Sequence, residues 1–141
     1  RLQFHPNNQE ICLELGAAPG GWAWVLSLLC KKVITFDRAP LEEEIASRSN
    51  VDHHIDDAFS LVPGDYPEVD WIFSDVICTP EKLYNWLLPW LQDKKKRNFC
   101  LTIKLKGEDN QKWIEKFRAI PNGNMLHLYH NKHELTFVLI P

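Results

Sequence analysis

The stretch Leu13-Glu14-Leu15-Gly16-Ala17-Ala18-Pro19-Gly20-Gly21-Trp22 decides how this chain folds. It completes an apolar run that begins at Ile11, and it opens a second apolar segment that extends to Cys30. The order of strand, glycine-rich turn and helix is how a parallel α/β sheet builds a cofactor site. The three glycines leave backbone N–H groups at the helix start open to a ligand. The spacing matches neither a dinucleotide fingerprint nor a P-loop, so an ordinary strand-to-helix turn is the alternative interpretation.

A carboxylate follows the next apolar run of the chain. Residues 33–36 are apolar or β-branched, and the run ends at Asp37. An acidic residue in this place accepts hydrogen bonds from the ribose hydroxyls of an adenosine-containing cofactor, and it repels a phosphorylated ribose. Asp37 therefore favours a cofactor site over an ordinary turn.

Strand-like and helix-like segments alternate along the whole chain. Thr79 is expected to cap the third helix, Pro89 to kink it or end its regular part early, and Asp109 to cap the fourth. The alternation predicts a single domain, residues 1–141, with a three-layer α/β sandwich and a mostly parallel sheet. The expected strands are 11–15, 33–36, 51–55, 69–74, 99–105, 125–129 and 134–140, and the first two expected helices are 20–31 and 41–47.

Polar residues and one glycine gather at the ends of the expected strands. Ligands of open α/β sheets bind beyond the carboxyl ends of the strands. A lysine inside the apolar strand 99–105 is the least ordinary member of this group. If the last strand is antiparallel, the residue at its start lies at the same edge. The six positions are Gly16, Asp37, Asp57, Asp75, Lys104 and Glu134.

The motif from Glu14 to Trp22 resembles the cofactor motif of the FtsJ/RrmJ-type ribosomal RNA 2′-O-methyltransferases. The C-terminal half is most similar to the RlmM branch of that family, through residues 71–75, 102–105 and 128–134. The resemblance implies a Rossmann-like class I fold that binds S-adenosylmethionine. It also implies an antiparallel C-terminal strand, inserted between the two strands that precede it.

The resemblance further implies which residues bind the cofactor. Asp37 and Asp57 match the carboxylates that hold the ribose and adenine of S-adenosylmethionine. The remaining cofactor residues that it implies are Gly16, Ala18, Pro19, Gly20, Gly21, Trp22 and Asp75.

The same resemblance implies a catalytic group for the methylation of a ribose 2′-hydroxyl of ribosomal RNA. Asp75, Lys104 and Glu134 match the last three members of a Lys-Asp-Lys-Glu tetrad, with Lys104 as general base. A base lysine has to be neutral when it acts, yet two neighbouring carboxylates raise its pKa. Lys104 as a residue that orients and polarises the hydroxyl is therefore the alternative.

One member of the tetrad has no counterpart in this chain. Its first lysine lies upstream of the cofactor motif, and no lysine precedes Lys31. We therefore expect a domain that lacks an upstream segment or a substrate-binding domain, and that binds cofactor but methylates RNA poorly alone. The net charge of -3 also suggests that another domain or partner supplies part of the RNA-binding surface. The basic cluster Lys94, Lys95, Lys96 and Arg97 is either an RNA contact or a solvated loop.

Other functions compete with this one. Cys78 follows Asp75 by three residues, as the nucleophile of an RNA cytosine-5 methyltransferase does, although Ile77 replaces the usual proline and a packed thiol is the simpler interpretation. A methyltransferase acting on amino groups is expected to carry Asn/Asp-Pro-Pro-Tyr/Phe, which is absent after residue 74. The non-enzyme alternative is a module that binds S-adenosylmethionine without activity of its own.

Composition bears on the cellular compartment, on membrane segments and on metal sites. The four cysteines form no C-x-x-C pair, which favours reduced thiols in a cytoplasmic protein. No run of 18 apolar residues is present, so we expect no membrane segment. His53 and His54 are adjacent on an expected strand and point to opposite faces, so we predict no metal site there or elsewhere.

Overall fold

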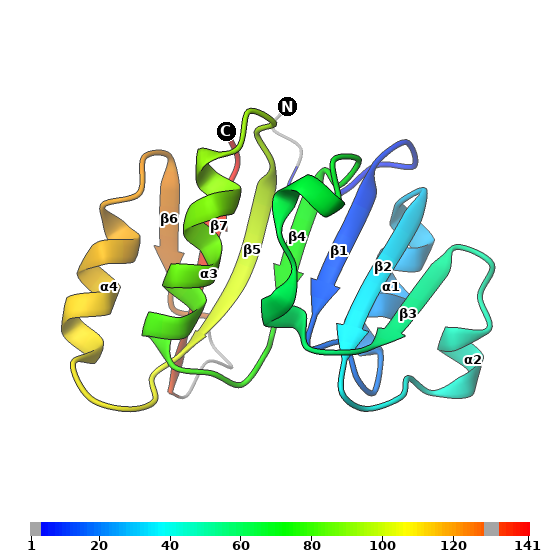
Figure 1. Ribbon diagram of the computed structural model, residues 1–141, viewed down its shortest axis with the longest axis horizontal. Helices are drawn as coiled ribbons and strands as arrows, with labels where there is room; N and C mark the ends of the chain where they lie inside the picture. Colours follow the sequence, from blue (N-terminus) through cyan, green and yellow to red (C-terminus); the bar gives the residue numbers. More distant parts are fainter. Residues whose placement is uncertain (1–3, 129–132) are drawn as a thin grey trace.

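A computed structural model describes residues 4–128 and 133–141 of the chain. They form a seven-stranded sheet in the order β3-β2-β1-β4-β5-β7-β6 (Figure 1). The strands are β1 (Ile11–Leu15), β2 (Lys32–Asp37), β3 (Val51–Ile55), β4 (Trp71–Ser74), β5 (Asn98–Lys104), β6 (Gly123–Leu126) and β7 (Glu134–Leu139). The helices are α1 (Gly21–Leu29), α2 (Glu43–Ala46), α3 (Pro80–Gln92) and α4 (Asn110–Arg118), with single 3-10 turns η1 (Ala58–Ser60) and η2 (Pro63–Asp65).

The sheet is parallel from β3 to β5 and antiparallel around β7. Strand β7 pairs antiparallel with both β5 and β6, so it lies between the two strands that precede it in the chain. This arrangement confirms the expected insertion of the last strand. The carboxyl ends of β1 to β5 meet at one edge of the sheet, the lower edge in Figure 1.

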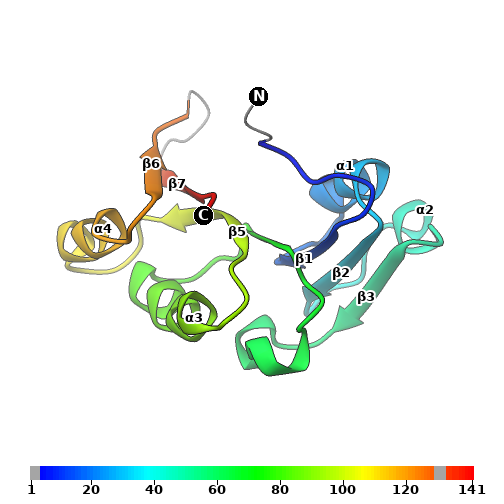
Figure 2. The ribbon, with the colours of Figure 1, turned by 90° about the horizontal axis from the view of Figure 1, so that it is seen from above.

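Helices cover the two faces of the sheet unequally, as the view from above shows (Figure 2). Helices α3 and α4 lie together on one face, where α3 contacts β5 and α4 contacts β6. Helices α1 and α2 lie on the other face, against β2 and β3. The expected three layers are therefore present. Within the described part of the chain, the half of that second face formed by β5, β7 and β6 has no helix over it.

Alternation along β5 explains how the main core forms. Phe99, Leu101 and Ile103 point to the α3–α4 face and are buried, as the two-residue period of a strand requires. They pack with aromatic side chains of α3, α4 and β7, including Phe117 and Phe137. Burial of such side chains contributes about 1.5–3 kcal/mol each, so this alternation fixes which face of β5 is covered.

Three helices differ from the sequence expectation in length. Helix α1 spans Gly21–Leu29, where 20–31 is expected. Helix α2 spans only Glu43–Ala46, and α3 continues past Pro89 to Gln92. The carbonyl that Pro89 leaves without a donor is that of Asn85, four residues earlier, and both residues are exposed. The lost hydrogen bond is therefore on the solvent-facing side of the helix, where it costs little, and the helix does not end. Thr79 caps α3 as expected, because its side chain accepts from the N–H of Lys82.

Asp109 holds the cap position of α4 but does not cap it. Its φ of 59° is left-handed and its carboxylate makes no capping hydrogen bond. A capping side chain requires an extended backbone at this position, so the expectation of an aspartate cap is wrong.

Two further expectations concern the end of the chain and membranes. The strand expected at 125–129 is β6, which spans Gly123–Leu126: it begins two residues earlier, and residues 127–128 are not part of it. Residue 129 lies outside the described residues. Among the residues that are described, no helix has the length and apolar character that a membrane crossing requires.

Candidate active site

A cavity of about 570 Å³ opens at the carboxyl edge of the sheet. It lies beyond the ends of β1, β2, β4 and β5, where open α/β sheets bind ligands. Six of the residues singled out in the sequence line it: Gly16, Ala18, Asp37, Asp57, Asp75 and Lys104. The strand ends therefore bring these side chains together, as their order along the chain predicts.

Three charged groups form one hydrogen-bonded cluster at this edge. The Lys104 Nζ lies 2.7 Å from Asp75 Oδ1 and 2.7 Å from Glu134 Oε2. Asp75 directly follows β4, Lys104 is the last residue of β5, and Glu134 is the first residue of β7. Glu134 sits opposite Lys104 because β7 is antiparallel, so the register of two strands positions the cluster.

The cluster holds Lys104 in its charged form. Partial burial disfavours the ammonium, but the hydrogen bonds that it donates to Asp75 and Glu134 outweigh burial and raise the pKa of Lys104 above its ordinary value. At neutral pH the lysine is therefore a hydrogen-bond donor with both carboxylates as acceptors. Asp75 is about half exposed (44% of its side chain), so it remains accessible to a second donor from the cavity.

Gly16 is required at the point where β1 and β4 end side by side. Its φ of 76° is left-handed, and a Cβ there would lie 2.9 Å from the backbone of Val76. Only glycine lets the turn after β1 pass this close to the chain that follows β4. The N–H of Gly16 also donates to the carbonyl of Phe36, which joins the turn to β2.

Asp37 holds the turn from the side of β2. One carboxylate oxygen accepts from the N–H of Ala18 and the other from the N–H of Ala39, each at 2.9 Å. Each oxygen of a carboxylate keeps a second acceptor site, so Asp37 is able to bind a ligand hydroxyl in addition. Asp57 is arranged similarly: it accepts from the N–H of Phe59 and lies 3.9 Å from the Arg38 guanidinium.

The rest of the glycine-rich turn faces away from the cavity. The carbonyl of Pro19 accepts from the N–H of Glu42, and a Cβ on Gly20 would lie 2.7 Å from Ile45 Cδ1. This part of the turn is therefore shaped by packing against α2. Trp22 is 39% exposed and lies edge-on to Phe73, on the α1 side of the sheet. Pro19, Gly20, Gly21 and Trp22 are thus absent from the cavity lining, in contrast to the other expected cofactor residues.

Glu14 is a buried acid beside this site that the sequence reasoning did not select. It is 2% exposed, and its Oε2 has no hydrogen-bond partner in the described part of the chain. Burial, with smaller contributions from the charges of Asp75 and Asp37, raises the pKa of Glu14 to about 8. The signal in the sequence was a carboxylate inside the apolar run 11–15.

The basic cluster 94–97 lies at the opposite edge of the sheet, between α3 and the start of β5. Arg97 is buried, and its guanidinium donates to the carbonyls of Val69 and Tyr66 and to the Asp93 carboxylate. Lys95 pairs with Asp70. The expectation that Arg97 contacts RNA is therefore wrong, because its side chain is enclosed by the protein.

Cys78 packs against the main hydrophobic core. Burial raises the pKa of its thiol, and the nearby Lys82 and Lys104 lower it by less. A nucleophilic cysteine needs the opposite shift, so the structure supports the packed thiol. All four cysteines are free thiols.

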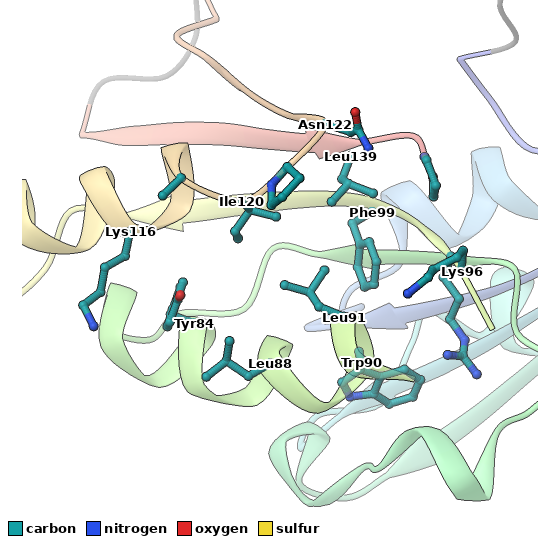
Figure 3. A pocket seen from close by; sticks show the side chains of 14 residues that line it. Tyr84, Leu88, Trp90, Leu91, Lys96, Phe99, Lys116, Ile120, Asn122 and Leu139 are labelled. Atoms are coloured by element: carbon teal, nitrogen blue, oxygen red, sulfur yellow. The ribbon is translucent and has the colours of Figure 1, made fainter. Parts of the chain in front are cut away.

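A second cavity, of about 470 Å³, lies between α3, α4 and the strands β5 and β7 (Figure 3). Leu88, Leu91, Phe99 and Ile120 point into it, with Lys96 at its rim. The titratable side chains of its lining are Tyr84, Lys96, Arg97 and Lys116, and the lining includes no Asp, Glu, Cys or His side chain among the described residues. Within the described part of the chain there is also no group of three potential metal ligands.

Comparisons with known proteins define the class of this fold. The structure superimposes on a Streptococcus mutans protein in complex with SAH with a TM-score of 0.65, at 13% identity, covering 96% of this chain and 92% of that one. Fibrillarin from Aeropyrum pernix, with natively bound S-adenosyl-L-methionine, gives a TM-score of 0.63 at 16% identity, covering 94% and 66%. The sheet order and these likenesses define the Rossmann-like fold of S-adenosylmethionine-dependent methyltransferases.

Sequence similarity relates the chain to one set of named proteins. The chain is 31% identical over 136 residues to "Ribosomal RNA large subunit methyltransferase M" of Halorhodospira halophila. The chain is thus a homologue of the ribosomal RNA large subunit methyltransferase M proteins over 93% of its length, and it spans about 40% of the length of that relative. No protein-family model matches the chain.

Proposed function

We propose that this domain transfers a methyl group from S-adenosylmethionine to a ribose 2′-hydroxyl of ribosomal RNA. The observation that carries the proposal is the cluster of Asp75, Lys104 and Glu134 beside a cavity at the carboxyl edge of the sheet. The similarity to ribosomal RNA methyltransferases supports the substrate.

The cavity fits the proposed cofactor in size and in chemistry. Its volume of about 570 Å³ is within the range of small-ligand sites, roughly 300–1,000 Å³. Asp37 and Asp57 offer carboxylate oxygens to ribose hydroxyls and to an exocyclic amine. The carboxylates of Asp37, Asp57 and Asp75, which line the cavity, provide negative potential for a cationic ligand. When bound, the cofactor supplies an activated methyl group on its sulfonium.

The geometry favours Lys104 as the group that orients the hydroxyl. A charged Lys104 donates to the hydroxyl oxygen, and the half-exposed Asp75 accepts the hydroxyl hydrogen. Correct placement alone is worth several kcal/mol of barrier in reactions of this kind. If Lys104 were instead the base, its raised pKa would make the rate climb tenfold per pH unit between pH 7 and 9.

We further propose that additional sequence completes the domain in the natural protein. Half of one sheet face has no helix over it in the described part of the chain, and the Halorhodospira halophila relative is longer than this chain (Figure 2). The chain alone is expected to bind cofactor and to methylate ribosomal RNA at least a hundredfold more slowly than a longer natural form, about the loss that misplaced substrate causes. Equal single-turnover rates for the two forms would contradict this part of the proposal.

Methyl transfer from labelled S-adenosylmethionine to deproteinised ribosomal RNA tests the function. Lys104→Ala is expected to lower the single-turnover rate by at least a hundredfold. Cys78→Ser is the matched control, because it alters a packed side chain near the same loop, and it should keep most of the rate. Loss of activity in the cysteine variant alone would show that Cys78, and not Lys104, is the catalytic residue.

A further inference from the structure

The basic cluster 94–97 lies too far from Lys104 to bind the phosphates next to the reacting ribose. That cluster precedes β5, whereas Lys104 ends it, and the seven residues of β5 span about 20 Å. A phosphate next to the reacting ribose cannot reach both ends. Cations that bind the phosphates flanking the reacting ribose therefore belong to the same edge of the sheet as Lys104.

The loop that follows β4 presents an apolar side chain at this edge. Ile77 is 72% exposed, lines the cavity, and lies two residues after Asp75. A singly exposed apolar residue is common on protein surfaces, but Ile77 lines the cavity and so is placed to pack against a ligand there. The flat face of a nucleobase or the carbon atoms of a ribose supply such a contact.

Two lysines belong to the same surface. Lys82 lies in the first turn of α3 and lines the cavity, with its ammonium 4.4 Å from the centre of the Phe59 ring. Lys106 is exposed and follows Lys104 by two residues. Its loop touches the loop of Ile77, because a Cβ on Gly107 would lie 3.7 Å from Thr79 Cγ2. Within the described residues, neither lysine is paired with a carboxylate.

The charge distribution separates two halves of the edge. The ends of β2 and β3 carry Asp37, Asp56 and Asp57, which repel a phosphate backbone. The stretches after β4 and β5 also carry carboxylates, Glu81, Glu108 and Asp109. What distinguishes them is that Lys82 and Lys106 have no carboxylate partner among the described residues, whereas Arg38 in the first half lies 3.9 Å from Asp57. Ammonium groups available to an RNA strand that presents its ribose to Lys104 therefore lie over the second half.

We propose that the loops after β4 and β5 form the RNA-contacting surface: Lys82 and Lys106 bind phosphates that flank the target nucleotide, and Ile77 packs against its base or ribose. The inference rests on the proposed function, because it takes single-stranded RNA as the partner. It assigns the electrostatic contact to two lysines outside the cluster 94–97.

Binding of a fluorescent single-stranded oligoribonucleotide to the 141-residue chain tests the surface. Lys82→Gln and Lys106→Gln should each lower the affinity about fivefold at low salt and reduce the salt slope by about 0.7, the value for one phosphate contact on a single strand. Ile77→Ala should weaken binding without changing the salt slope. Lys94→Gln removes the same charge at the opposite edge and should change neither quantity.

The outcomes separate this surface from the function on which it rests. Wild-type affinity in both Lys82→Gln and Lys106→Gln, an equal loss in Lys94→Gln, or no binding of the oligoribonucleotide by the wild-type chain overturns the surface. Calorimetric titration of S-adenosylmethionine into the wild-type chain is read independently. Absence of cofactor binding would contradict the proposed function even where the lysine variants behave as expected.

Discussion

Replacing the buried acid Glu14 with glutamine should stabilise the protein, and by an amount that grows with pH. Burial and the neighbouring carboxylates raise the pKa of Glu14 from 4.5 to about 8. The folded protein therefore keeps the proton over a pH range in which the unfolded chain has lost it. Stability contributed by the neutral acid is complete below pH 4.5 and is lost as the pH rises towards 8.

The size of the effect follows from the shift. A change from 4.5 to about 8 corresponds to at most about 5 kcal/mol, reached above pH 8, and to about 3 kcal/mol at pH 7. Glu14→Gln has nearly the shape of the neutral acid but does not titrate. The free energy of unfolding of the variant minus that of the wild type should therefore increase from pH 4.5 to pH 9.

Urea denaturation of both proteins at pH 5, 7 and 9 measures this difference. Every other titrating group is common to the two proteins, so its contribution cancels. A difference that is the same at all three pH values would refute the reasoning, because it would show that Glu14 has an ordinary pKa. A second readout is proton release: a cationic ligand favours the ionised acid, so S-adenosylmethionine binding at pH 7 should release a proton in the wild type but not in Glu14→Gln.

Two further predictions concern single side chains. Asp37→Asn should weaken S-adenosylmethionine binding about ten- to a hundredfold, because the amide replaces one acceptor oxygen with a donor that faces a backbone N–H. Calorimetry measures this change, and an unchanged Kd would contradict the role of Asp37. Arg97→Ala should lower the free energy of unfolding by about 3 kcal/mol, because it leaves the carbonyls of Val69 and Tyr66 without donors, whereas the exposed Lys94→Ala should change it by less than about 0.5 kcal/mol. Equal effects of the two variants in urea denaturation would show that Arg97 is not a structural residue.

Local sequence order predicted the part of the site that depends on strand ends. The apolar run 11–15 locates β1 to the residue, and the parallel order then requires Asp37 and Asp75 to meet at one edge. The bounds 51–55 expected for β3 are also confirmed, although this segment is mostly polar. The antiparallel return of β7, expected from family resemblance, places Glu134 opposite Lys104. Their contact is thus a consequence of topology.

Side-chain environments were less predictable, because they depend on residues distant in the chain. Arg97 follows three lysines and looked solvated, yet the carbonyls that enclose it come from residues 66 and 69. Gly20 looked like a ligand-binding glycine, yet α2 packs where its Cβ would be. Glu14 looked like an ordinary strand residue, and only the fold shows its buried carboxyl beside two others.

The chemical position of the transferred methyl group tests the central proposal most directly. Ribosomal RNA methylated with labelled S-adenosylmethionine by the longest natural form of the protein is digested to nucleosides and separated. The proposal predicts that the label is recovered in a 2′-O-methylnucleoside and is lost in Lys104→Ala. Label at carbon 5 of cytosine, with a covalent RNA adduct that disappears in Cys78→Ser, would contradict it.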